Sequence, residues 1–311
     1  MRIAVSERFF ATTHPAPLQE VNQIANYNAA VHSREELASD FRDLGVSAGD
    51  TVMVHASVRS VGPIAGGPDQ IHLALKDVLT SRGTLMMYAS CPDGYDDVGR
   101  GHLSPAAERA IIDKQPPFDA FIAKAQRENG ALVEFFRSYP GSIVNNHVAR
   151  FVVWGHYAQH LISQQPWDFA FGHDSALARF VELDGRILLI GCDHDNVTFL
   201  HYAEHIVDIP GKRIARFEVP VLENGERVWK EMAEVDTSDQ GAHPNWPPRF
   251  FAQIVNAHLA RTRNRGRAVG HAHCFLTDAK GLLDVALSQM RAAALPEGQA
   301  LRDPARHGPP H

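Results

Sequence analysis

Residues 51–89 read TVMVHASVRSVGPIAGGPDQIHLALKDVLTSRGTLMMYA, and this stretch decides the fold class of the chain. It begins with the β-branched run Thr51–Val54 and ends with the apolar run Thr84–Ala89, and each run predicts a strand. Between them, a glycine-rich loop over residues 62–67 precedes apolar residues at helical spacing, which predict a helix from Pro68 to Leu79. A strand, a helix and a second strand in this order indicate an α/β fold with two parallel strands.

The flanking sequence continues this mixture of helices and strands. Ser33 and Glu36 form a capping-box pair that predicts the start of a helix, and Gly45 is expected to end it. The tripeptide Glu223-Asn224-Gly225 between two alternating runs predicts a β-hairpin. Residues 90–119 are rich in proline and glycine and are expected to form a long polar loop. Further helices are expected over residues 132–136, 199–206, 250–259 and 281–290, and further strands over residues 149–154, 186–191 and 270–276.

The domain organisation follows from the absence of an internal repeat or a dividing linker. We therefore expect one domain over residues 33–295. Residues 1–32 show little periodicity and are expected to form an irregular N-terminal extension. Residues 296–311 are rich in proline and glycine and are expected to form a disordered tail.

The composition argues against several classes of function. The 311 residues carry a net charge of -6, whereas a nucleic-acid-binding protein needs a basic surface. Cys91, Cys192 and Cys274 are far apart and form no disulfide framework, which indicates a reducing compartment. The chain starts without the apolar core of a signal peptide, and no apolar run approaches the ~20 residues of a membrane span. We therefore expect a cytoplasmic protein that binds neither nucleic acid nor membranes.

The first cluster of chemically active residues is His201-Tyr202-Ala203-Glu204-His205. On a helix, His201 and His205 share a face and could chelate zinc with Glu204 as base, as in a zinc-dependent hydrolase. Such a site needs a third protein ligand, and no downstream residue identifies one. The pair also suits metal-free acid–base catalysis, because His201 accepts a proton near neutral pH and Glu204 stabilises the imidazolium. A third interpretation is that these histidines are ordinary helix residues.

Two loops supply further candidates. The loop His55–Gly67 follows a predicted strand and precedes a predicted helix, an arrangement in which backbone N–H groups hold phosphate. An ordinary tight turn has the same pattern. The acidic loop Asp93–Asp97 would attract a polycation if it lies beside a site, and Asp236 and Asp239 are a similar case.

Taken together, these segments resemble the aminoglycoside 3-N-acetyltransferase family over about residues 33–292. The loop His55-Ala56-Ser57 and the block Thr198-Phe199-Leu200-His201-Tyr202-Ala203-Glu204 are the most specific parts of the match. The remaining matching segments follow the family's order and are Asp50–Val54, Val58–Pro63 with Gly66-Gly67, Gly83–Met86, Pro116–Asp119, Asn129-Gly130, Leu188–Gly191, Pro210–Arg213, Val269–Ala272 and Leu276–Ala279.

The resemblance implies a single α/β domain with a mixed, partly parallel central sheet flanked by helices. It implies a metal-free acyltransferase that moves the acetyl group of acetyl-CoA to the 3-amino group of an aminoglycoside antibiotic and confers resistance. His201 takes the catalytic role, and Glu204, Asp195 or Asp236 orients its ring. The residues expected to face the coenzyme are His55, Ser57, Val58, Arg59, Gly66 and Gly67. Those expected to face the polycationic acceptor are Tyr88, Asp93, Tyr95, Asp96, Asp97, Asn146, His147, Asp195 and Asp239.

One segment departs from the family pattern. The family carries Ser-x-His-Pro before a strand, and here Asn146 stands at the position of its His and His147 at that of its Pro. Because this segment borders the active site in the family, the departure concerns the choice of acceptor. We expect the segment to form a strand entrance rather than packed interior.

Two rival functions stay open beside the acetyltransferase. A zinc hydrolase would contain stoichiometric metal whose removal abolishes activity. A non-catalytic protein that sequesters aminoglycosides would need no acetyl-CoA, so release of the CoA thiol separates it from the enzyme. In either case the chain is expected to be a monomer or a homodimer.

Overall fold

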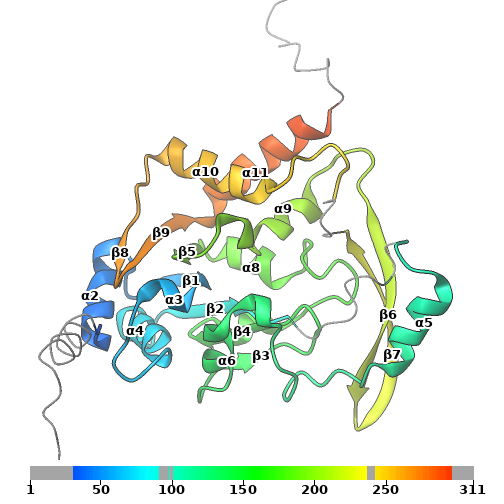
Figure 1. Ribbon diagram of the computed structural model, residues 1–311, viewed down its shortest axis with the longest axis horizontal. Helices are drawn as coiled ribbons and strands as arrows, with labels where there is room; N and C mark the ends of the chain where they lie inside the picture. Colours follow the sequence, from blue (N-terminus) through cyan, green and yellow to red (C-terminus); the bar gives the residue numbers. More distant parts are fainter. Residues whose placement is uncertain (1–30, 91–97, 99–100, 237–241, 296–311) are drawn as a thin grey trace, which may run out of the picture.

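The computed structural model describes residues 31–90, 98, 101–236 and 242–295, and its centre is a seven-stranded mixed sheet (Figure 1). The strand order is β3-β4-β2-β1-β5-β9-β8. In the middle, β1 (Thr51–Ala56) pairs in parallel with β2 (Thr84–Tyr88) and with β5 (Arg186–Ile190). Antiparallel pairings extend the sheet to β4 (Phe151–Gly155) and β3 (Ile143–Val144) on one side, and to β9 (Ala272–Asp278) and β8 (Arg267–Val269) on the other. The predicted parallel pair and the mixed α/β fold are confirmed.

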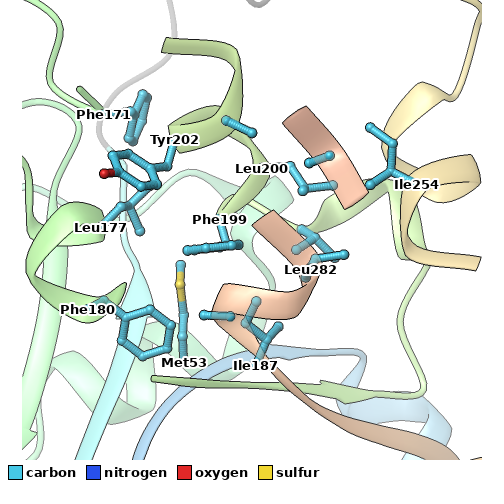
Figure 2. Packing of buried hydrophobic residues seen from close by; sticks show 14 of the residues in the cluster. Met53, Phe171, Leu177, Phe180, Ile187, Phe199, Leu200, Tyr202, Ile254 and Leu282 are labelled. Atoms are coloured by element: carbon cyan, nitrogen blue, oxygen red, sulfur yellow. The ribbon is translucent and has the colours of Figure 1, made fainter. Parts of the chain in front are cut away.

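Side chains alternate between the two faces of the sheet, and helices cover each face. Met53 and Ile187 belong to the core of one face, where they pack beneath Phe199 (Figure 2). Val52 and Leu188 belong to the core of the opposite face. The first face is covered by the layer of α7 (Ala158–Ile162), α8 (Ala176–Glu182), α9 (Leu200–Ile206), α10 (Phe250–Thr262) and α11 (Ala279–Ala294). The second is covered by α2 (Arg34–Leu44), α4 (Asp69–Leu79) and α6 (Ala131–Arg137).

Local signals in the sequence explain where several elements begin and end. Ser33 Oγ accepts from Glu36 N at 3.2 Å and Glu36 Oε2 accepts from Ser33 N at 2.7 Å, so the predicted capping box starts α2. Gly45 ends this helix with a φ of 108°, in the left-handed region that glycine tolerates. Three short helices occupy connecting segments: α3 (Val58–Val61), η1 (Arg127–Asn129) and η2 (His194–Asn196).

A two-stranded hairpin stands beside the main sheet (Figure 1). It consists of β6 (Ile214–Glu223) and β7 (Glu226–Val235), and Asn224 and Gly225 form its turn with φ values of 52° and 83°. Positive φ at both turn residues is what the Asn-Gly signal predicts, so the hairpin prediction is confirmed. The long polar loop predicted over residues 90–119 is wrong in its second part, because α5 (Pro105–Lys114) lies there and packs on β6. Ser104 caps α5, and Pro105 follows at its first position, where proline is well tolerated.

Some predicted features lie outside the described residues. They are most of the N-terminal extension, the tail over residues 296–311, Asp93, Tyr95, Asp96 and Asp97 of the acidic loop, and Asp239. Within the described part of the chain, no helix combines the length and apolar character needed to cross a membrane.

Candidate active site

Helix α9 carries the predicted pair His201 and Glu204 in direct contact. His201 Nδ1 lies 2.6 Å from Glu204 Oε2. The Glu204 side chain is 4% exposed and that of His201 is 25% exposed, so a buried carboxylate supports a ring that meets solvent. A carboxylate only accepts hydrogen bonds, so neutral His201 carries its proton on Nδ1 and presents the lone pair of Nε2.

Two aromatic rings fix the plane of the His201 ring. Phe171 stacks on it with ring centroids 5.4 Å apart and an interplanar angle of 29°, and Phe251 of α10 meets it edge-on at 5.1 Å. Tyr88, at the end of β2, contacts Phe171 at 5.7 Å, which places this predicted acceptor residue in the same neighbourhood. The other face of α9 is buried in the core, where Figure 2 shows Tyr202 beside Phe171. The His201 ring is therefore held on a rigid support.

The loop after β1 reaches the same region. Burial lowers the pKa of His55 to about 4, and the nearby His201 adds to this effect, so His55 is neutral at physiological pH. Ser57 stands at the N-cap of α3, and Ser60 Oγ lies 2.9 Å from both Ser57 Oγ and the Gly191 carbonyl oxygen. These contacts join the carboxyl ends of β1 and β5. In parallel sheets, ligands bind outside this edge.

The rest of this loop is partly open to solvent. Val58 is half-buried and Arg59 is exposed, and both lie in the single turn of α3. Gly66 and Gly67 have φ values of 84° and 85°, which side chains rarely adopt.

The other carboxylates that sequence reasoning proposed for His201 have different partners. Asp195 Oδ1 accepts from Ala252 N at 3.0 Å and so caps the first turn of α10. Asp236 Oδ2 lies 3.4 Å from Arg213 Nη2 at the end of the hairpin. Glu204 contacts the His201 ring directly, with its Oε2 2.6 Å from Nδ1.

The second histidine of the H-x-x-E-H pattern has both ring nitrogens engaged. His205 Nδ1 lies 2.7 Å from the His201 carbonyl oxygen, and its Nε2 lies 2.8 Å from Glu234 Oε2. Its side chain is 1% exposed. Across residues 31–90, 101–236 and 242–295, no group of three or more His, Cys, Asp or Glu side chains is placed to hold a metal ion. The geometry of His205 is that of a residue that links α9 to β7.

The departing segment at Asn146 and His147 contradicts the expectation of a loosely packed strand entrance. His147 has no exposed surface, its Nδ1 accepts from Ala149 N at 3.0 Å, and its ring lies 4.7 Å from that of Trp167. Burial lowers the pKa of His147 to about 4, so the ring is neutral. Asn146 is exposed. Of the two residues, Asn146 is therefore the one that can meet a ligand without rearrangement.

Several residues that shape the site were not found by sequence reasoning. Phe171, Phe251 and Glu234 come from elements far from α9 along the chain, and no local spacing signals such contacts. Arg150 is fully buried, and its guanidinium donates to the carbonyl oxygens of Ala89 at 3.0 Å and Ala120 at 2.5 Å. Arg150 thereby ties the end of β2 to the segment that follows α5.

An imidazole with a buried carboxylate partner, set beside the carboxyl ends of parallel strands, is the arrangement found in α/β enzymes that use acid–base chemistry. Residues 53–291 match the sequence profile of the family described as Aminoglycoside 3-N-acetyltransferase. The chain belongs to this family.

Individual relatives match over most of their length. The aminoglycoside N(3)-acetyltransferase III of Pseudomonas aeruginosa is 35% identical over 262 residues, which cover 84% of this chain and 94% of the relative. The aminoglycoside N(3)-acetyltransferase VII of Streptomyces paromomycinus is 37% identical over 267 residues, covering 83% and 91%.

Solved structures agree with this assignment. AAC-IIIb in binary complex with CoASH superposes with a TM-score of 0.77 at 37% identity, covering 84% of this chain and 96% of that one. AAC-VIa bound to sisomicin superposes with a TM-score of 0.79 at 35% identity, covering 85% and 99%.

Proposed function

We propose that this chain transfers the acetyl group of acetyl-CoA to the 3-amino group of an aminoglycoside, with His201 as the base. The observation that carries the proposal is the 2.6 Å contact between His201 Nδ1 and Glu204 Oε2 in a chain of this family. Relatives of the same fold supply the substrate classes, since AAC-IIIb is described with CoASH and AAC-VIa with sisomicin.

The His201–Glu204 pair accounts for the proton transfers. The acceptor amine must lose its ammonium proton before its nitrogen can attack the thioester carbonyl, and it loses a second proton as the amide forms. His201 Nε2 takes a proton from the attacking nitrogen, and the buried carboxylate of Glu204 stabilises the imidazolium that results. The imidazolium then returns this proton to the departing thiolate. The products are the N-acetylated acceptor, CoA thiol and the proton released from the ammonium.

The two substrates would approach from different sides of His201. The coenzyme would lie along the loop with His55, Ser57, Val58, Arg59, Gly66 and Gly67, which follows the carboxyl end of β1. The acceptor would contact Tyr88 and the exposed Asn146, with the acidic loop and Asp239 attracting its positive charges. Asp195 and His147 would support the acceptor site without touching the acceptor, because each forms a hydrogen bond within the protein. The use of acetyl-CoA and cysteines that lie far apart along the chain both support a cytoplasmic location.

The decisive experiment measures CoA thiol release from the purified chain over a panel of aminoglycosides. We expect release that needs both substrates and a product acetylated at the 3-amino group, as located by NMR. Binding of an aminoglycoside without thiol release would favour a sequestering protein. Activity that disappears with a chelator and returns with zinc would favour the hydrolase.

A further inference from the structure

The carboxylate of Glu234, on hairpin strand β7, contacts two different elements of the active-site region. Its Oε2 lies 2.8 Å from His205 Nε2 on α9. Its Oε1 accepts from Ala170 N at 2.6 Å, in the loop before α8. The Glu234 side chain is 14% exposed, so both bonds are sheltered from water.

Each of these contacts leads to His201. His205 Nδ1 is 2.7 Å from the His201 carbonyl oxygen, so the His205 ring fixes the backbone of the catalytic turn. Phe171 follows Ala170 directly and stacks on the His201 ring at 5.4 Å. One carboxylate therefore supports both the backbone and the ring plane of the base.

Helix α9 needs such support because it is short. It has 7 residues, and helices of this length are unstable without tertiary contacts. Its last turn is held by Lys212, which donates to the His205 carbonyl oxygen at 2.9 Å, and by the His205–Glu234 pair.

The His205 ring joins two elements of the site. One ring nitrogen faces a carbonyl oxygen and the other faces a carboxylate, and both of these groups only accept. The ring therefore bridges the backbone of α9 and the carboxylate of Glu234. This pairing gives the second histidine of the H-x-x-E-H pattern a function without a metal.

We propose that Glu234 is a positioning residue that sets the orientation of His201 through His205 and Phe171. The inference rests on the proposed role of His201 as base. This role of Glu234 differs from that of Glu204, which contacts the base directly. It makes the hairpin part of the catalytic apparatus.

The test compares Glu234→Ala with Glu231→Ala, a control at an exposed position of the same strand. We expect Glu234→Ala to lower kcat by about 100-fold, the usual effect of a small misplacement of a reacting group, with the KM for acetyl-CoA little changed. Glu231→Ala should keep the wild-type kcat. The double variant Glu234→Ala/His205→Ala should lose no more than Glu234→Ala alone, because coupled residues are not additive.

The Glu234→Gln variant distinguishes the loss of the positioning contacts from the loss of the negative charge. It also provides the test if the alanine variant does not fold. Its amide oxygen can accept from Ala170 N, and its NH2 group can donate to a neutral His205. We therefore expect it to restore kcat to within a few-fold of wild type. A wild-type kcat in Glu234→Ala, a multiplicative loss in the double variant, or a glutamine variant as slow as alanine would each overturn the proposal.

Nitrogen NMR of the histidine rings tests the same idea without any substrate. We expect wild-type His201 to carry its proton on Nδ1, with the His201 signals altered in Glu234→Ala but not in Glu231→Ala. Unchanged His201 signals would refute positioning. A wild-type chain that acetylates no aminoglycoside would instead refute the proposed function, and the NMR result would still decide the role of Glu234.

Discussion

The chemistry of the site depends on which nitrogen of His201 carries the proton. Glu204 Oε2, 2.6 Å from Nδ1, can only accept, so Nε2 presents its lone pair to a ligand. His55 brings a second imidazole close by, and burial lowers its pKa to about 4. His55 therefore places no second positive charge beside His201 at neutral pH, and Glu204 would balance the imidazolium that the proposed mechanism forms.

Replacing His201, the proposed base, should slow the reaction without unfolding the protein. We expect His201→Ala to lower kcat by at least about 100-fold, the scale of a positioned acid–base group. The ring is partly exposed and lies above the core, so the melting temperature should change little. Steady-state kinetics and thermal unfolding of the same preparation check both statements. A folded variant with near-normal kcat would show that another group takes the proton.

The contact between His201 and Glu204 could be predicted because residues three apart on a helix lie on one face. The tertiary neighbours of His201 could not. Phe171 and Glu234 reach α9 through the packing of a loop and a hairpin, and nothing in the local pattern encodes those contacts. The expectation for His147 was wrong, because its place ahead of a strand suggested a strand entrance and the structure buries the side chain completely.

Lys76 is a buried cation in a cage of aromatic rings. Its Nζ lies 3.9 Å from the ring centroid of Tyr139, 5.0 Å from that of Phe136 and 5.1 Å from that of Trp154. Burial lowers the pKa of Lys76 to about 8, and Arg34 contributes a smaller decrease. The rings offset only part of the cost of removing the ammonium from water.

This lowered pKa predicts how the stability of the fold depends on pH. The unfolded lysine has a pKa of about 10.4, so between the two values the unfolded state binds the proton and the folded state does not. The contribution of Lys76 to the free energy of unfolding should therefore rise with pH from about 8 to about 10.4 and be least favourable below that window. We expect Lys76→Met to be more stable than wild type at neutral pH, with the advantage disappearing at the top of the window. Urea unfolding of both proteins at several pH values measures this difference, and a pH-independent difference would contradict the assignment.

At the scale of elements, two glycines show the difference between the strain of a positive φ and a steric clash with a neighbouring backbone. Gly155 ends β4 with a φ of +107°, and a Cβ there would lie 2.1 Å from the Gly83 carbonyl oxygen. Gly225, in the hairpin turn, has a φ of +83° and open space around the same position. Both positions strain an L side chain, but only Gly155 also brings it against another strand's backbone.

The pair gives a matched prediction for stability. Gly225→Ala should cost about 1–2 kcal/mol, the price of left-handed geometry for an L residue. Gly155→Ala should cost more than this, because β2 and β4 must separate to relieve the clash. Chemical denaturation of the two variants makes the comparison. Equal losses would mean that the Gly83–Gly155 approach is loose enough to adjust.

Elements with their own local signals were predictable, and elements fixed by context were not. The Asn224-Gly225 turn specifies its hairpin because few other residues accept positive φ at both turn positions. Helix α5 carried a comparable signal in Ser104 and Pro105, but the prolines and glycines around it favoured a loop. It contacts the hairpin, for example through Arg109 Nη1 and Glu218 Oε2 at 3.0 Å.

At the scale of the whole molecule, the parallel core followed from the residue 51–89 pattern, whereas the position of the hairpin did not. Strand order near the centre is constrained by the strand–helix–strand unit. The hairpin meets the rest of the protein through tertiary contacts such as Phe118 N to the Pro220 carbonyl oxygen at 2.7 Å and His205 to Glu234. Such contacts join segments that are far apart along the chain. The spacing of apolar residues within one segment carries no information about them.

The charge of the whole molecule leads to a final prediction about its two substrates. The chain has a net charge of -6, and an aminoglycoside is a polycation whereas acetyl-CoA is an anion. Acidic side chains beside the acceptor site should therefore attract one substrate and repel the other. Exposed charges are screened over about 8–10 Å at physiological ionic strength, so the attraction should weaken as salt is added.

We expect the triple variant Asp93→Asn, Asp96→Asn, Asp97→Asn to raise the KM for the acceptor and to leave the KM for acetyl-CoA nearly unchanged. The increase should be largest at low salt and shrink as ionic strength rises, because screening already removes the attraction in the wild type. A control with the same change in net charge replaces Glu35, Asp43 and Glu226, which are exposed on α2 and at the hairpin turn. If the field of the whole molecule steers the acceptor, the control and the triple variant will behave alike. If the acidic loop forms part of the acceptor surface, only the triple variant will raise the acceptor KM, and an equal rise in both KM values would refute the loop's role.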